Sequence, residues 1–358
     1  MNKFLFILSL FVIESGFAQL PQIEGVIHSE DLFNTTMKPG VSCYRIPALL
    51  SAKNGVLLAA IDERINSCAD LNGNDNINIV MRTSKNKGLS WSAIRTLVDY
   101  PEGQSASDPS FILDEETGTI FLFYNYMDRF KEKNTYYLHL IKSTDHGETW
   151  SEPEDITPQI TKPEWKKDFK FITSGKGTQT ASGTLLHTLV NLQYGVFIFG
   201  SEDHGKTWFL KENPIKNADE SKIIELQDGI WMVNSRLNKL GMRYVSLSKD
   251  QGQSWESKED SALLDPSCNA AIIRYRHRGK NCLLFVNAAS RDDRRNLTLK
   301  VSTDEGKSWT AGRTIFSGSS AYSDLVVMKN GDIGILFEKN NYRENVFVRY
   351  TFKWLSVR

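Results

Sequence analysis

The sequence predicts an all-β protein, a six-bladed β-propeller formed as one domain by residues 19–358. Three observations predict this fold. An octapeptide typical of a tight turn occurs five times, strand-like runs precede its copies, and long stretches with helical periodicity are absent. The copies begin 59, 58, 47 and 54 residues apart, and repeats of about 50 residues indicate a propeller or a solenoid. Five copies fit six blades if one blade lacks the turn.

The first 18 residues have the pattern of a secretory signal. Lys3 supplies a positive charge, Phe4–Ile13 is largely apolar, and Ala18 places a small residue before a cleavage site at Gln19. The apolar run is too short to span a bilayer comfortably, which disfavours a membrane anchor. We therefore expect a secreted or periplasmic protein without a membrane anchor.

Charge and cysteine content limit the classes of function. The 43 Lys and Arg residues equal the 43 Asp and Glu residues, so the basic excess typical of nucleic-acid binders is absent. Export permits disulfides, but four cysteines allow three pairings, and buried free thiols are an equal alternative. Their spacing resembles no zinc site, and we expect neither a metal nor a cofactor. The cysteines are Cys43, Cys68, Cys268 and Cys282.

The repeated octapeptide has the residue types that a turn requires. In Ser143–Trp150, Asp145 can accept hydrogen bonds from the amides that follow it, and Gly147 permits a positive φ. The final Trp can bury its ring beneath the turn. One regular acidic side chain, replaced by Asn86 in the first copy, is too few for a calcium loop. We expect one copy on a hairpin tip of each blade that carries it; the copies begin at Ser84, Ser143, Ser201, Ser248 and Ser302.

Two motifs together resemble those of sialidases. The octapeptide is similar to the Asp-box of that family, and Tyr44–Pro47, which reads Tyr-Arg-Ile-Pro, resembles the sialidase motif whose Arg binds the substrate carboxylate. The resemblance covers nearly all of residues 19–358. It implies an exo-α-sialidase that removes terminal sialic acids from glycans and acts as a monomer.

The resemblance also implies three arginines that hold the carboxylate of sialic acid. Arg45 is the first, and Arg236, which ends a strand-like run, resembles the second. Arg294 is our assignment for the third, with its neighbour Arg295 as the alternative. A planar guanidinium can bind a carboxylate through two parallel hydrogen bonds, which Lys cannot do.

A loop after the first motif resembles the family loop that carries the catalytic acid. We assign this role to Asp70, with Asp75 as the alternative. Closure of such a loop over a sugar would exclude water and raise the pKa of the carboxyl group until it holds a proton. Arg64 and Asp108 match substrate-contacting positions of the family, although either could form a structural ion pair.

The nucleophile implied by the resemblance is Tyr322, in the run Ala-Tyr-Ser-Asp. A phenol has an unperturbed pKa of about 10 and needs a base within hydrogen-bond reach. Glu220 is the expected base, and Glu225 is the alternative. A neutral Tyr avoids the repulsion that an attacking carboxylate would meet at an anomeric centre bearing its own carboxylate, and two displacements predict retention of configuration.

Alternative functions remain open at the level of sequence. A trans-sialidase or an intramolecular trans-sialidase would use the same residues and differ in what intercepts the intermediate. A non-catalytic glycan-binding propeller would lack part of the set, whereas all the residue types are present. The aromatic segment Trp165–Phe171 is a candidate rim of the site.

Overall fold

A computed structural model describes residues 26–356. The predicted signal in residues 1–18 lies outside the described residues, so its boundary with the propeller domain stays a prediction. Nearly all regular structure in the described part is β-strand. Three short α-helices and one 3₁₀ helix connect or follow strands: α1 (Arg129–Glu132), α2 (Thr157–Ile160), η1 (Pro163–Trp165) and α3 (Phe352–Ser356). Within residues 26–356, none of the helices has the length and apolar character needed to cross a membrane.

The first three sheet units follow one another along the chain. The first contains β2 (Val41–Ser51), β3 (Leu57–Ile65), β4 (Ile77–Ser84) and β5 (Arg95–Val98). The second contains β6 (Gln104–Leu113), β7 (Ile120–Asp128), β8 (Tyr137–Ser143) and β9 (Glu154–Asp155), with β11 (Gly175–Lys176) paired parallel to β6. The third contains β10 (Lys170–Ile172), β12 (Thr178–Gln179), β13 (Leu185–Asn191), β14 (Gly195–Ser201) and β15 (Phe209–Leu210).

The remaining strands form one four-stranded and one seven-stranded sheet. The smaller contains β16 (Ser221–Glu225), β17 (Trp231–Ser235), β18 (Gly241–Ser248) and β19 (Glu256–Asp265). The larger contains β20 (Ala271–His277), β21 (Lys280–Ala288), β22 (Arg295–Ser302), β23 (Arg313–Val327), β24 (Ile333–Lys339), β25 (Glu344–Tyr350) and β1 (Val26–Asn34). Its long strand β23 pairs with β22 through its first part and with β24 through its second part, so this sheet comprises two units.

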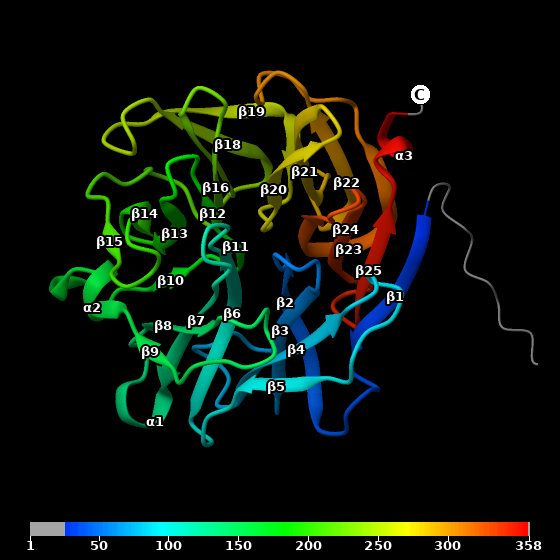
Figure 1. The fold of residues 1–358 in the computed structure, drawn as a ribbon. Coiled ribbons are helices and arrows are strands. Elements are labelled where there is room, and N and C mark those ends of the chain that lie inside the picture. The colour runs from blue at the N-terminus through cyan, green and yellow to red at the C-terminus, as the bar shows by residue number, and fades with distance from the viewer. Residues whose placement is uncertain (1–25, 357–358) are drawn as a thin grey trace, which may run out of the picture.

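The six units are arranged around a common centre (Figure 1). Inner strand β2 contacts β6 on one side and β23 on the other, and β16 contacts both β13 and β20. The β20–β23 and β6–β12 contacts complete the ring. The predicted all-β, six-bladed propeller is therefore confirmed.

The final unit explains why only five octapeptides occur. Each octapeptide connects the third and fourth strands of its unit, as between β4 and β5 or between β22 and β23. In the final unit the third strand is β25, and the fourth is β1, which comes from the other end of the described chain and pairs antiparallel to β25. These two strands are not consecutive, so no turn joins them.

The octapeptide turn has the predicted hydrogen bonds. The Asp145 carboxylate accepts from the Thr149 amide at 2.9 Å, and the Gly147 amide donates to the Ser143 hydroxyl at 2.8 Å. Gly147 has a φ of 90°, and a Cβ there would lie 2.3 Å from Leu58, so Gly is required on both counts. The final Trp is fully buried only in the third copy, at Trp208, and is partly exposed in the others.

These turns should make stability fall at acid pH. Hydrogen bonds lower the pKa of the four box aspartates from 3.8 to about 2, so their contribution is present above pH 4 and lost as the pH falls toward 2. Asn86 makes the equivalent contact without titrating, because it accepts from the Ser90 amide and donates to the Ser90 hydroxyl. Changing Asp145, Asp203, Asp250 and Asp304 to Asn should therefore reduce the drop in melting temperature between pH 6 and pH 3, followed by circular dichroism. An equal drop in variant and wild type would contradict this assignment.

Candidate active site

Irregular positions in three inner strands accompany the predicted site residues. Strand pairing shifts register at Arg45–Ala48 in β2, Ser107–Ser110 in β6 and Ser320–Ser323 in β23. Two residues within these bulges, Ile46 and Asp108, have positive φ angles of 64° and 63°. A bulge reorients side chains that would otherwise alternate strictly between the two faces of a strand. The bulges therefore explain how residues of three different units can converge.

Tyr322 and Glu220 form a buried hydrogen-bonded pair. The Tyr322 hydroxyl donates to Oε2 of Glu220 at 2.7 Å, and Nη1 of Arg236 donates to the same carboxylate oxygen at 2.5 Å. Arg236 Nη1 also lies 3.2 Å from the Tyr322 hydroxyl. Burial, and next the Glu220 charge, raise the pKa of Tyr322 well above its usual value. The phenol is thus neutral at rest and has a carboxylate acceptor in place. The alternative base, Glu225, lies at the far end of β16 and accepts from the Ala181 amide.

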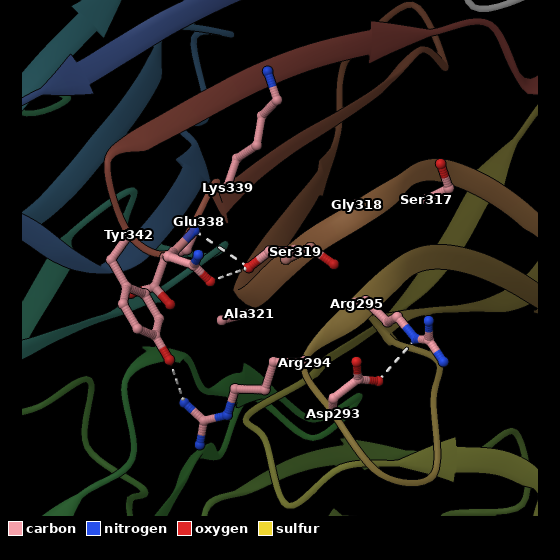
Figure 2. A pocket seen from close by; sticks show the side chains of 12 residues that line it. Asp293, Arg294, Arg295, Ser317, Gly318, Ser319, Ala321, Glu338, Lys339 and Tyr342 are labelled. Atoms are coloured by element: carbon pink, nitrogen blue, oxygen red, sulfur yellow. Dashed lines mark hydrogen bonds and ion pairs between the residues drawn. The ribbon is translucent and has the colours of Figure 1, made fainter.

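Arg45 and Arg294 lie close to the ring of Tyr322. Their guanidinium carbons are 5.6 and 5.5 Å from the ring centroid. The alternative to Arg294 points elsewhere, because Arg295 pairs with Asp293 at 2.8 Å and is more than half exposed (Figure 2). The structure therefore brings together the three predicted arginines and separates Arg295 from them.

Glu338 is a site residue that the sequence reasoning missed. Its Oε1 accepts from Nε of Arg45 at 2.7 Å and from the Ile46 amide at 2.9 Å, and its Oε2 accepts from the Tyr322 amide at 3.0 Å. It is fully buried near the end of the apolar strand β24. A carboxylate in such a strand needs a buried partner, and this was the available signal.

Asp70 lies beside the cluster on the loop after β3. It is bound by Arg64, whose Nη1 donates to Oδ1 of Asp70 at 2.7 Å, and its side chain is 75% exposed. Burial acts to raise the pKa of Asp70, but the Arg64 charge, followed by Arg45, outweighs it and lowers the pKa below 3.8. The increase expected on closure of the loop over a sugar stays a prediction. The alternative acid, Asp75, pairs with Arg129.

Arg64 and Asp108 occupy different environments. Arg64 is fully buried and bridges Asp62, at 3.0 Å, to Asp70, so in this structure it forms the ion pair that the sequence left as one possibility. Burial, and next the charge of Asp62, raise the pKa of Asp108 to about 8. A protonated Asp108 could donate a hydrogen bond to a ligand, while Asn125 donates to its other side at 3.0 Å.

A cavity of about 300 Å³ is lined by some of these groups. Its polar lining includes Asp70, Asp108, Glu220, Arg236 and Tyr322, and its apolar lining includes Ile46, Leu71, Tyr136, Phe169, Phe171 and Leu192. The candidate rim segment thus contributes two of its aromatic residues, but Trp165 is buried against Phe197 instead. The lining of the cavity thus combines ionisable groups with aromatic and aliphatic side chains.

Comparison with known proteins identifies the family. Residues 56–335 match the model of a BNR repeat-like domain. A sialidase of Micromonospora viridifaciens is 34% identical over 92% of this chain and 55% of its own length. The chain belongs to the sialidase family. A second sialidase, from Bacteroides fragilis, is 29% identical over 84% of this chain and 60% of its own length. This sialidase-family chain therefore spans little more than half the length of these relatives.

A solved structure supports the same conclusion for the fold. The Hadza microbial sialidase Hz136 superposes with a TM-score of 0.80 and 29% identity, over 87% of this chain and 66% of that protein. The fold and the family are thus established together.

A disulfide ties the Asp70 loop to the strand that carries Arg45. Cys43 in β2 is bonded to Cys68, while Cys268 and Cys282 are free and buried. The structure therefore combines the two alternatives that the sequence left open, with one bridge and two buried free thiols. Each bonded cysteine lies two residues from a site residue, so the bond links the predicted acid to the arginine cluster.

Removal of this disulfide should weaken both stability and turnover. A loop of 25 residues corresponds to about 3 kcal/mol of stabilisation. Cys43→Ser with Cys68→Ser should lower the melting temperature and, because the Asp70 loop gains freedom, also kcat. Cys282→Ser is the control, because it removes a buried free thiol from another unit and should leave kcat unchanged. Alkylation of unfolded, unreduced wild type should modify two thiols; modification of four would show that the bond does not form.

Proposed function

We propose that the chain is a secreted exo-α-sialidase that hydrolyses terminal sialic acids from glycans with retention of configuration. The contact between Tyr322 and Glu220, at 2.7 Å within a ring of three arginines, carries this proposal. Family membership supports it, and so do relatives described as sialidases.

Binding would begin with the carboxylate of the sugar. Arg45, Arg236 and Arg294 each keep N–H donors beyond those used within the protein, since a guanidinium has five. Glu338 and Glu220 hold two of these side chains in place, so little rotamer freedom is lost when a carboxylate binds. The apolar wall formed by Phe169 and Phe171 would receive the acyl group.

The first displacement would form a glycosyl–tyrosine bond. The Tyr322 oxygen attacks the anomeric carbon as its proton passes to Glu220, and the bond to the leaving oxygen breaks. Asp70 donates a proton to that oxygen. Because Tyr322 has a raised pKa, the proton must move during attack, and the short contact with Glu220 allows this.

The second displacement would return the protein to its starting state. Asp70, now ionised, removes a proton from water, and the hydroxide attacks the anomeric carbon from the side that the leaving group vacated. The bond to Tyr322 breaks, and the phenolate recovers its proton from Glu220. Two inversions give net retention, so the first product is α-sialic acid.

A proton NMR time course on α2,3-, α2,6- and α2,8-linked sialosides tests the proposal. We expect α-sialic acid before mutarotation. An anhydro sugar, or transfer to added lactose, would identify a transferase that uses the same site, and no turnover of any linkage would favour a glycan-binding propeller. For export, a secreted protein that begins at Gln19 supports the signal, and retention of residues 1–18 would contradict it.

A further inference from the structure

We propose that Tyr342 is a positioning residue for the carboxylate site: its hydroxyl holds Arg294 and its ring supports Arg45. The inference rests on the proposed function, because it assigns a role within that site. Tyr342 lies in the hairpin loop between β24 and β25, whereas the two arginines come from the first and fifth units. A single side chain thus connects three blades at the place where the carboxylate would bind.

The contacts of Tyr342 are direct. Nη1 of Arg294 donates to its hydroxyl at 3.1 Å, and the guanidinium carbon of Arg45 lies 4.0 Å from its ring centroid. Figure 2 shows the Tyr342 hydroxyl directed at the Arg294 guanidinium, and both residues line a second cavity, of about 390 Å³. A cation stacked on an aromatic face gains favourable electrostatic energy and keeps its in-plane N–H groups available.

Arg294 depends on Tyr342 more than the other arginines do. Arg45 pairs with Glu338, and Arg236 pairs with Glu220. Arg294 has no carboxylate within ion-pair distance among residues 26–356, and besides Tyr342 it donates to the carbonyl of Ser267 at 3.0 Å. The phenol therefore orients the guanidinium without neutralising its charge. An acidic partner would have competed with the substrate carboxylate for that charge.

The backbone around Tyr342 is held in an unusual conformation. Asn340, Asn341 and Tyr342 have consecutive positive φ angles of 53°, 54° and 67°. Such a conformation is unfavourable for Tyr and persists only where the surroundings enforce it.

The surroundings that enforce this conformation centre on Ser319. Its carbonyl accepts from the Asn340 amide at 3.0 Å, and its hydroxyl donates to the Asn341 side chain at 2.8 Å and lies 3.2 Å from the Asn341 amide. Ser319 precedes Tyr322 by three residues in β23. The nucleophile and the support of Arg294 are therefore fixed to the same strand. These hydrogen bonds indicate that Tyr342 has a fixed position. They disfavour the alternative that its loop is a mobile lid over the arginines.

Tyr342→Phe removes the contact with Arg294 and keeps the ring. We expect the dissociation constant of sialic acid, measured by calorimetry, and KM for an aryl sialoside both to rise about tenfold, with kcat within about twofold. Tyr342→Ala, which also exposes Arg45, should raise both further. Tyr126→Phe is the matched control, because it loses a phenol hydrogen bond to Gln104 in the second unit, outside the site. Melting temperatures show whether each variant is folded.

A double-mutant cycle separates positioning from a general loss of structure. In an Arg294→Lys background, Tyr342→Phe should change KM by less than about twofold, because the planar guanidinium that the phenol orients is absent. The inference would be overturned if Tyr342→Phe kept wild-type affinity, or if it weakened affinity equally in both backgrounds. Turnover by the wild type would still uphold the proposed function in either case. Tighter binding by Tyr342→Phe would overturn the inference too, since the phenol would then compete with the substrate.

Discussion

Tyr322→Phe should lower kcat for sialyllactose hydrolysis by about 10³-fold or more, with a much smaller change in KM. The substitution removes one oxygen, which donates to Glu220 in the structure and is the attacking atom of the proposed mechanism. No nearby side chain replaces it, because Glu220 would bring a negative charge toward a centre that already bears a carboxylate. Loss of an attacking group typically costs this much or more. The remaining ring still lies close to Arg45 and Arg294, so substrate binding should persist.

Two comparisons make this result specific. Tyr126→Phe, the same chemical change at a position in β7 that does not line the site cavity, should leave kcat unchanged. Glu220→Gln keeps the hydrogen-bonding shape but cannot accept the phenolic proton, so it should also lower kcat strongly. If Tyr322→Phe retained more than about a tenth of wild-type kcat on sialyllactose and still released α-sialic acid, Tyr322 would not be the nucleophile. The measurement is a proton NMR time course with both variants.

The predicted fold came from local information. Ser, Asp, Gly and Trp in the octapeptide act within a few residues of one another, so a repeated turn is visible without knowledge of long-range packing. The sequence also predicted that one of the six blades lacks the octapeptide. It did not predict the reason, because the pairing of β1 with β25 joins opposite ends of the described chain.

The site was predictable where a motif carries the residue. Arg45, Glu220, Arg236, Arg294 and Tyr322 lie together in the structure, although their order in the sequence gives no sign of this. Glu338 and Tyr342 were missed because their roles consist of contacts between units, and Arg45 is 293 residues from Glu338. The Cys43–Cys68 bond could not be singled out among the possible pairs of the four cysteines for the same reason.

The ion pair of Asp70 is a feature that the sequence did not predict. The carboxyl group was expected to gain a raised pKa on closure over a sugar, which stays a prediction, whereas in the structure the bond from Arg64 at 2.7 Å lowers it. The sequence contains both residues, but not their distance, and a charge in contact outweighs partial burial. For Asp70 to act as an acid, substrate binding must weaken this ion pair or bury the carboxyl group further.

Asp70→Ala should therefore affect substrates according to their leaving groups. Sialyllactose has a poor leaving group that needs a proton, so kcat should fall by about 10²- to 10⁴-fold, whereas a nitrophenyl sialoside, which leaves as a stable anion, should lose less than about tenfold. Asp75→Ala is the matched control, because Asp75 follows on the same loop and pairs with Arg129 instead. Asp75→Ala should change kcat only slightly, and by the same factor for both substrates.

The pH profile provides a second test of the same role. Because Arg64 lowers the pKa of Asp70, the protonated fraction of that carboxyl group is small at neutral pH and grows as the pH falls. For sialyllactose, kcat/KM of the wild type should therefore rise from pH 8 toward pH 5, and Asp70→Ala should lose this rise. Equal losses on both substrates, or an unchanged pH profile, would exclude Asp70 as the proton donor. The ion pair would then serve only to hold the loop.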